Sequence, residues 1–459
     1  MNGSRHLRNN ATRARFAGAR TDAATRCLRC LVVLLSCFLF AIPANAAGEP
    51  APQEPPKEQP PGEPVAAPDE TPEASPVQPA LPDYFFPDLG KQALGHESKY
   101  FTFRPVIATV LDYTWFDQDE SSVEQVGVQD DQGELRAGRL GGTLRWKGDY
   151  KWEFYGTVDW QEKKTREEAV FQVYDVRFRF PIGKVNLDFG KMKEPISYEL
   201  TGLSIMLPQQ ERILLPFYPS RSIGFKLSGP LAGDRMTWSV GAFNDFLDAG
   251  TGYGNVGNDY VGRLTGLAWE SPDKQSYLHL GLGYRDLGSD DGIIRFNGRP
   301  ESNVADKYVD TGELPADRAG AVSYELLVQY RQFSILAERF DVKVDSPETG
   351  DPKFLGWYVA GSWVLTGESR PYVRAGGYAG GIVPSRRWGA LELVGKYSRL
   401  DLTDELVEGG ELDKWHFGLN WWCSTQWKVG LSWGDADLDK EGLVGNTKML
   451  LLRLQWLWG

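Results

Sequence analysis

The chain has 459 residues, 41% of them hydrophobic and 24% charged, with a formal net charge of −12 at pH 7. An acidic surface repels phosphate backbones, which argues against nucleic acid as a partner. Three of the four cysteines lie in the first 46 residues, so an exported chain without them would keep only Cys423 and no internal disulfide.

The first 46 residues have the composition of an export signal. They contain seven arginines and one aspartate, then an apolar stretch over 30–42 in which only Ser36 is polar, and a small-x-small pattern at 44–46. Thirteen residues are too few to cross a bilayer of about 30 Å as a helix. We therefore predict a cleaved signal peptide over 1–46, whose removal takes the net charge to −18. The alternative, a lipoprotein acylated at Cys37, would need a very short apolar stretch.

Residues 47–97 are rich in proline and glutamate and poor in large aliphatic side chains. Such a segment buries too little apolar surface to offset its ordering entropy. We predict a disordered, extended periplasmic linker, and a passive tether is favoured over a specific partner motif.

From residue 98 to 459 the sequence alternates between apolar and polar side chains with a period of two. In 151–161, for example, Trp152, Phe154 and Trp160 face one way, while Asp159 faces the other. The same alternation recurs in 139–147, 174–180, 223–227 and 428–433, and it assigns Tyr174 to the apolar face. A soluble sandwich would alternate similarly, so the period alone does not identify the fold.

The number and spacing of the strands are more specific. Their connections alternate between short ones, such as 148–149 and 424–425, and long ones, such as 193–220 and 288–319. Short turns at one rim, long loops at the other and an even strand number are typical of an outer-membrane barrel, which must close because an open edge leaves unpaired backbone groups in lipid. We predict an all-β transmembrane antiparallel β-barrel over 98–459, of about sixteen strands. They begin near residues 101, 134, 150, 170, 184, 221, 235, 260, 276, 320, 332, 354, 387, 413, 426 and 447.

The chain ends with MLLLRLQWLWG, residues 449–459. Leu450, Leu452, Leu454 and the two tryptophans share one face, which contains no polar group, whereas Arg453 lies on the other. We interpret this segment as the closing strand, with its apolar face against outer-membrane lipid.

Several stretches resemble the phosphate-selective porin O and P family: 185–202, 356–372 with LTGESRPY, 389–404 with KYSRLDL, 409–422 with GLNWW, and the final LLRLQW. The resemblance implies a sixteen-stranded barrel, usually a homotrimer, that passes small anions, phosphate included. Three features depart from the family pattern. Gly459 follows the terminal aromatic residue, the chain is unusually acidic, and Leu200 follows Glu199 where phosphate-selective relatives have a lysine.

The long segment between the fifth and sixth strands, which begins at Lys193, is the best candidate for a loop that constricts the lumen. A row of cationic groups with few acids beside it would attract anions and pass them on, and arginine can bind two oxygens of one phosphate. Alternatively, these cations pair with Glu153, Asp159 and Asp175 on a wet wall. The candidate pore and anion-binding residues, joined on the wall by Lys184, are Arg139, Arg145, Lys147, Arg177, Arg179, Lys193, Arg212, Arg221 and Lys226.

We expect the acidic residues to lie in external loops. One cluster extends from Asp117 to Asp131, another extends from Glu405 to Asp413 in or beside a loop, and a third comprises Asp435, Asp437 and Asp439. The third has the spacing of a calcium loop, but its glycine is displaced and no glutamate closes it, so a loop is the better interpretation. Similarly, GYGNVG at 252–257 lacks the strand and helix of a nucleotide site. We predict no metal and no cofactor.

The sequence therefore favours a passive outer-membrane channel for small anions. A general non-selective pore, or a barrel that anchors the outer membrane to the cell wall, is the main alternative. A barrel hydrolase would need a serine beside His279 or His416, and nothing in the sequence assigns one, so we predict no catalytic residues.

Overall fold

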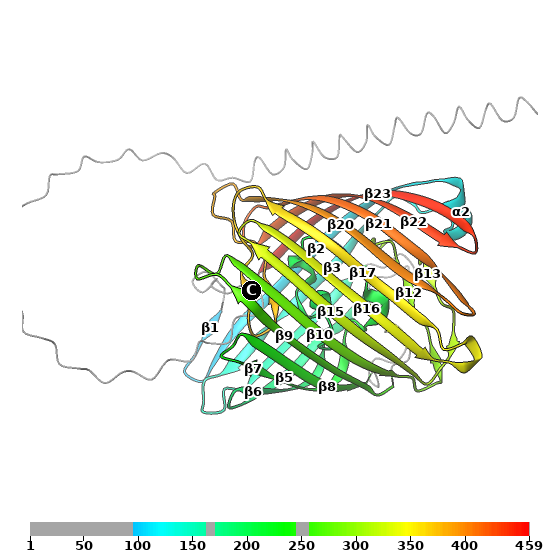
Figure 1. Cartoon of the computed structure of the whole chain (residues 1–459). Helices are drawn as coiled ribbons and strands as arrows, with labels where there is room; N and C mark the ends of the chain where they lie inside the picture. Colours follow the sequence, from blue (N-terminus) through cyan, green and yellow to red (C-terminus); the bar gives the residue numbers. More distant parts are fainter. Residues whose placement is uncertain (1–94, 162–169, 245–256, 459) are drawn as a thin grey trace, which may run out of the picture. The chain divides into compact units, whose positions relative to one another are not determined.

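The computed structural model describes residues 95–161, 170–244 and 257–458 (Figure 1). The predicted signal peptide, the linker up to residue 94 and all of GYGNVG except Gly257 lie outside these ranges. None of the described helices is long and apolar enough to cross a membrane. The barrel strands are β2 (Phe101–Gln118), β3 (Gln132–Trp146), β4 (Glu153–Gln161), β5 (Val170–Ile182), β6 (Val185–Met192), β7 (Ser222–Leu231), β8 (Met236–Asn244), β9 (Asp259–Glu270), β10 (Ser276–Gly288), β15 (Arg318–Tyr330), β16 (Phe333–Asp345), β17 (Lys353–Val364), β20 (Ala390–Asp404), β21 (Val407–Trp422), β22 (Trp427–Lys440) and β23 (Leu443–Trp458).

These strands form a closed antiparallel barrel of sixteen strands, as predicted. Each strand pairs with its neighbour in sequence, and β23 closes the barrel on β2 with a register that begins at Ile107 opposite Trp458. Closure gives every spanning strand two partners, which satisfies the backbone in lipid. Fourteen of the strands begin within three residues of the predicted positions, and the exceptions, β21 and β23, begin earlier than expected.

The predicted division into inward and outward faces is confirmed along most strands. On the outside, Leu140 is 58% exposed and Trp160 is 55% exposed, whereas Asp159 between β3 and β5 is fully buried in the lumen. In β23, Leu450 to Trp458 alternate between half-buried outward positions and buried inward ones, with Arg453 inside. The apolar face of the last strand is therefore its outer face.

Tyr174 is an exception to the predicted phase. The pairing of β4 with β5 shifts between Thr157 and Val158, because Thr157 is opposite Asp175 and Val158 is opposite Val173. The additional residue between them, Tyr174, forms a β-bulge, and its hydroxyl accepts a hydrogen bond from Arg139 in the lumen. The prediction that Tyr174 lies on the outer apolar face is thus wrong.

One of the acidic clusters near the C-terminus also differs from the prediction. Asp435, Asp437 and Asp439 lie in β22, so they belong to a strand and not to a loop. Glu408 and Glu411 lie in β21, beside the connection 405–406, which agrees with a position in or beside a loop. The connection from β22 to β23 has only two residues outside the strands, 441–442. Both have positive φ, which fits the two-residue hairpin turns that follow the twist of the strands.

One long connection also lies at the unexpected rim. Because strand directions alternate, β17 ends at the same rim as the strands joined by the short turns 183–184 and 423–426, so segment 365–389 connects β17 to β20 from that rim. The predicted separation of short and long connections therefore fails at this position. The shorter elements between or beside the barrel strands are β1 (His96–Glu97), α2 (Glu120–Val126), α3 (Tyr198–Thr201), η1 (Ser204–Met206), η2 (Leu215–Phe217), β11 (Ile293–Ile294), β12 (Asn297–Gly298), β13 (Val309–Asp310), β14 (Leu314–Pro315), η3 (Pro347–Thr349), β18 (Tyr372–Val373) and β19 (Tyr378–Ala379).

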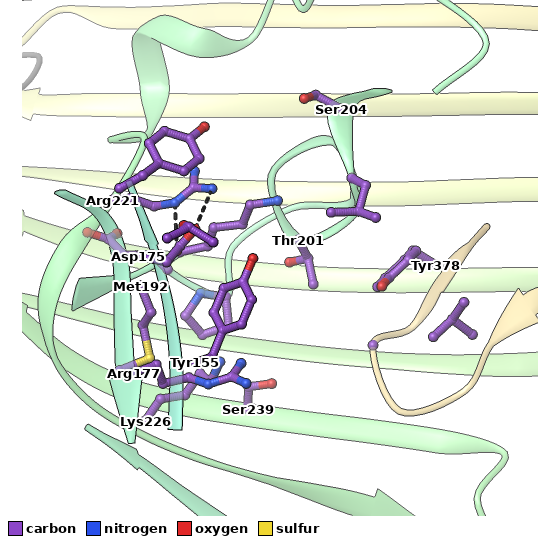
Figure 2. Close-up of a pocket in the computed structure, with 18 of the residues that line it drawn as sticks. Tyr155, Asp175, Arg177, Met192, Thr201, Ser204, Arg221, Lys226, Ser239 and Tyr378 are labelled. Carbon is purple, nitrogen blue, oxygen red and sulfur yellow. Dashed lines mark hydrogen bonds and ion pairs between the residues drawn. The ribbon is translucent and has the colours of Figure 1, made fainter. Parts of the chain in front are cut away.

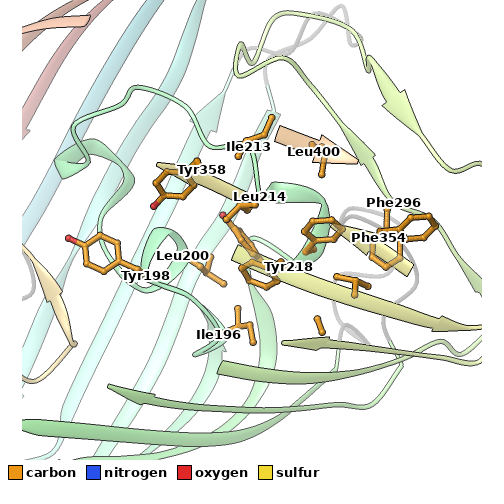
Figure 3. Close-up of a cluster of buried hydrophobic side chains, with 14 of the residues drawn as sticks. Ile196, Tyr198, Leu200, Ile213, Leu214, Tyr218, Phe296, Phe354, Tyr358 and Leu400 are labelled. Atoms are coloured by element: carbon orange, nitrogen blue, oxygen red, sulfur yellow. The ribbon is translucent and has the colours of Figure 1, made fainter. Parts of the chain in front are cut away.

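The lumen contains a hydrophobic core made by the long connections. Segment 193–221 and segment 289–317 pack against inward side chains of β16, β17 and β20 (Figure 3). Figure 3 shows Leu214 and Tyr218 among Phe296, Phe354 and Leu400. The expectation that 193–221 folds into the barrel is confirmed, and its apolar residues explain why, since they cover one another away from water.

The backbone of segment 193–221 is held by polar side chains of the barrel wall. Asn420 donates a hydrogen bond to the Pro208 carbonyl at 2.8 Å, and the Lys428 ammonium group donates to the Leu207 carbonyl at 3.1 Å. Glu338 accepts bonds from the amides of Tyr198 and Glu199 at 2.7 and 3.0 Å. These bonds replace the water that the buried backbone loses.

We expect Leu452→Lys to impair barrel assembly, because its side chain projects outward midway along the closing strand. A lysine there costs about 2–4 kcal/mol near the bilayer midplane, whereas Val444→Lys, on the same face close to the rim, costs about 0–1 kcal/mol. The measurement is the amount of heat-modifiable barrel in outer membranes. Equal amounts for the two variants would contradict the outward orientation of Leu452.

Candidate functional site in the barrel lumen

Beside the hydrophobic core lies a cavity of about 160 Å³, which we call the lumen cavity. Its lining comes from β2 to β8, from segment 193–221 and from segment 365–389 (Figure 2). The structure brings seven of the nine predicted site residues to this lining: Arg139, Arg177, Arg179, Lys193, Arg212, Arg221 and Lys226.

Most of the cations on the barrel wall have a carboxylate partner. The Arg139 Nε lies 3.1 Å from Asp159, and the Arg177 Nη2 lies 2.6 Å from Glu153. Arg145, from β3, shares Glu153 with Arg177 at 2.7 Å. For these residues, ion pairs with wall carboxylates describe the contacts better than a row of cations without acidic partners.

The pairing continues across β5, β6 and β7. Asp188 on β6 accepts from Arg179 at 2.6 Å and lies 3.2 Å from the Lys226 ammonium group. Asp175 accepts from Arg221 at 2.9 Å, the interaction drawn with dashed lines in Figure 2. Sharing of Glu153 and Asp188 leaves the wall with more cations than carboxylates, so it keeps a net positive charge.

An aromatic ring separates two of these arginines. Tyr174 lies with its centroid 4.2 Å from the guanidinium carbon of Arg139 and 3.9 Å from that of Arg221. At such distances the ring face attracts both cations and helps to fix their planes. Strand periodicity does not predict this arrangement, because it depends on the bulge at Tyr174.

Lys193 and Arg212 differ from the wall cations. Lys193 donates to the Gly202 carbonyl at 2.6 Å, and Arg212 donates to the Glu199 carbonyl at 3.4 Å. Within the described residues, neither has a carboxylate oxygen within 4.0 Å. Burial, followed by the neighbouring Arg221 and Arg212, holds the pKa of Lys193 well below its usual range.

Arg145, Lys147 and Lys184 do not line the lumen cavity. Arg145 pairs with Glu153 close to the short-turn rim, and Lys147 follows β3 and pairs with Glu97 at 2.5 Å. Lys184 lies in the exposed two-residue turn between β5 and β6, so its predicted place on the inward face is wrong. These positions lie at or near the rim because the strands end there.

The two histidines considered for catalysis have other surroundings. The His279 Nδ1 lies 2.7 Å from the Tyr372 hydroxyl, and its Nε2 lies 3.1 Å from Glu325. His416 is buried and faces the lumen. Neither has a hydrogen bond to a serine within the described part of the chain, so the geometry of a serine hydrolase is not formed by these residues.

The comparisons with known proteins place the chain in a family. The model of the phosphate-selective porin O and P family matches residues 107–458, which is nearly the whole described barrel. The chain belongs to this family. Its fold and family are those of a channel of the outer membrane.

Individual relatives are more distant. A stretch of 213 residues is 29% identical to an uncharacterized protein of Caulobacter vibrioides, and the match covers 43% of this chain and 42% of that protein. The fold is similar to that of an anion-selective porin from Comamonas acidovorans, at 11% identity and a TM-score of 0.52 over 78% of this chain and 100% of that one. It is also similar to the channel DcaP of Acinetobacter baumannii, at 11% identity and a TM-score of 0.51 over 79% and 99%.

Sequence reasoning missed the lining from segment 365–389. This segment contributes Val373, Ala375, Gly376 and Tyr378 to the lumen cavity. It begins within the family signature LTGESRPY, and Arg370 of that signature donates to the Met206 carbonyl at 2.7 Å, which joins the two segments inside the barrel. The sequence signal that could have pointed to this segment is the signature LTGESRPY. Only the folded structure shows that the segment lies in the lumen.

We expect the triple variant Arg177→Gln, Arg179→Gln, Arg212→Gln to lose any anion preference of the channel. Three positive charges disappear from the lumen cavity while Glu153 and Asp188 remain, so the chloride-to-potassium permeability ratio should fall at least several-fold. The measurement is the reversal potential in a potassium chloride gradient. Arg339→Gln is the matched control, since Arg339 is 54% exposed and pairs with Asp341 on the outer face. An unchanged ratio in the triple variant would refute the role of these arginines.

Proposed function

We propose that this protein is a passive channel that lets small anions diffuse through the outer membrane with a moderate preference over cations. The observation that carries the proposal is the charge on the lining of the lumen cavity. Among the described residues, seven cationic side chains line it, against Asp175 and Glu194 on the lining itself. The carboxylates of Glu153, Asp159 and Asp188 pair with the wall cations from beside the cavity, so five acids stand against seven cations and the local charge remains positive. Membership of the porin family and the printed description of the Comamonas acidovorans porin as anion-selective support it.

The local charge outweighs the acidic character of the whole chain. Acids such as Asp117, Glu405 and Asp439 lie at the far ends of strands or in their connections. Their field is screened over about 8 Å in physiological salt, whereas an ion in the lumen cavity is within contact distance of its lining. The electrostatic attraction between a permeating anion and the lining cations is therefore stronger than its repulsion by the acids near the rims.

We propose general anion passage with phosphate among the solutes, and not strict phosphate specificity. Leu200, where phosphate-selective relatives have a lysine, is fully buried in the hydrophobic core. The adjacent Glu199 is also buried, and the ammonium group of Lys396 approaches it to 3.9 Å from β20. Burial raises the pKa of Glu199, so this part of the segment is packed and offers no exposed lysine to a phosphate.

The remaining parts of the proposal concern export and assembly. We propose that residues 1–46 are removed on export, that the segment up to residue 97 is a periplasmic linker, and that the barrels assemble as homotrimers, as the family resemblance implies. A trimer would cover part of the apolar outer surface of each barrel, which otherwise faces lipid.

Planar-bilayer recordings test the proposed function directly. We expect the purified protein to insert as a steady conductance, with a reversal potential in a potassium chloride gradient that corresponds to anion preference. Absence of any conductance from correctly folded protein would favour the anchoring role, and cation preference would overturn the proposal.

We expect the anion preference to weaken as the pH rises, before ordinary lysines lose their charge near pH 10.4. A lysine is cationic only below its pKa, and burial with Arg221 and Arg212 nearby lowers that of Lys193. The other charged groups facing it are Asp175 and Arg139. Lys193→Met should remove much of this pH dependence of the reversal potential, whereas Lys343→Met, at an exposed position paired with Asp345, should retain it. Identical pH profiles for the two variants would refute the assignment.

A further inference from the structure

The lumen cavity has two chemically different sides. One side carries the cations of β3, β5 and β7, and the other is formed by Val373, Ala375 and Tyr378 of segment 365–389. Figure 2 shows Tyr378 across the cavity from Arg177 and Arg221. Leu203 and Ile205 of segment 193–221 add further apolar surface to the lining. A permeating ion therefore meets charge on one side and a nonpolar surface on the other.

The apolar side is fixed in position. Arg263 on β9 donates to the carbonyls of Gly376 and Gly377 at 2.9 and 2.8 Å, and the Ala379 amide donates to the Tyr198 hydroxyl at 3.0 Å. These bonds hold segment 365–389 against the lumen. A surface held in this way can select among solutes by shape and polarity, because it does not need to be ordered on binding.

The free binding capacity on the charged side is concentrated at Arg212. Arg212 is only 9% exposed, and its Nε has no hydrogen-bond partner among the described residues. The hydrogen bond that it donates to the Glu199 carbonyl is long at 3.4 Å. A buried guanidinium group with unused donors is costly unless an acceptor reaches it. Arg212 also lines a second, smaller cavity with Arg299 and Lys307, so an anion on it would lie between two compartments of the lumen.

The cations without a carboxylate partner show where an anion can bind on the lining. The wall arginines already bind Glu153, Asp159, Asp175 and Asp188. Of the seven cations that line the lumen cavity, Lys193 and Arg212 are the two for which the described residues supply no carboxylate oxygen within 4.0 Å. A carboxylate offers two oxygens in the plane of a guanidinium group. Inorganic phosphate presents polar oxygens on every side, and those that face Val373 and Ala375 would lose water without gaining a donor.

We propose that the lumen cavity recognises organic monocarboxylates with an apolar or aromatic body and favours them over inorganic phosphate. The carboxylate binds Arg212 and Lys193, and the body lies against Val373, Ala375 and Tyr378. This inference rests on the proposed function, since it names the class of anion that the channel selects. It follows the usual composition of small-molecule sites, in which an apolar lining surrounds a few polar groups that fix orientation.

The test compares benzoate, acetate and inorganic phosphate as blockers of the chloride current through the full channel in planar bilayers. Benzoate and acetate have the same charge and differ in the apolar body. We expect benzoate to halve the current at a concentration about tenfold lower than acetate or phosphate, a difference of ~1.4 kcal/mol. Equal blocking by benzoate and acetate, or stronger blocking by phosphate, would overturn the proposal.

Variants assign the effect to the two sides of the cavity. Arg212→Gln should abolish the block by benzoate. The near-isosteric pair Val373→Thr, Ala375→Ser should reduce benzoate to the potency of acetate, and Arg339→Gln on the outer face should leave it unchanged. If the double variant conducts and benzoate blocks it as strongly as the parent, Val373 and Ala375 do not contact the ligand and the proposal is overturned. If the double variant does not insert, the comparison of benzoate with acetate on the parent channel still tests the proposal. Anion preference without selective block refutes only this inference, whereas cation preference refutes the proposed function.

Discussion

A polypeptide segment that enters a barrel must have its backbone hydrogen-bonded there, and this requirement organises the lumen. Segment 193–221 satisfies it with side chains of β21, β22 and β23, since Asn420, Lys428 and Gln455 all donate to its carbonyls. Arg453 donates to the Gln210 carbonyl and also binds Asp112 and Glu211. The side chains of Asn420, Lys428 and Arg453 on this half of the barrel therefore position the segment.

The same anchoring makes the lumen asymmetric. Once segment 193–221 is fixed to one half of the wall, its apolar side chains and those of segment 289–317 form a core that fills this half. Lys414 donates to the Pro300 carbonyl at 2.8 Å and so ties the second segment to β21. The open space remains beside β2 to β8, and solutes that cross the barrel there pass the cations of β3, β5 and β7.

Most cations beside that space form ion pairs with wall carboxylates, so they contribute to selectivity through their field and less through direct binding of a solute. Asp188 and Glu153 each serve two cations, and Tyr174 lies between Arg139 and Arg221. These groups produce a positive field but have few unused donors. In the binding mode proposed above, a solute is instead held by the two cations of segment 193–221, Lys193 and Arg212, and by the apolar surface opposite them. A weak field from the wall and a small binding site together suit a channel that attracts anions and still releases them.

The sequence by itself determined the barrel, because alternation with a period of two, an even strand number and the apolar final strand leave few other folds for an exported chain. It also determined that Arg177 and Arg179 face inward, since strand phase is a local property and Phe178 between them faces outward. The inward orientation predicted for Lys184 failed because the strand ends before it. The partners of those cations were decided only by the tertiary structure, because register and bulges bring Asp188 to Arg179 and turn Tyr174 inward. The place of segment 365–389 was decided in the same way, because a long connection enters the lumen only where buried groups such as Arg263 and Tyr198 can bind its backbone.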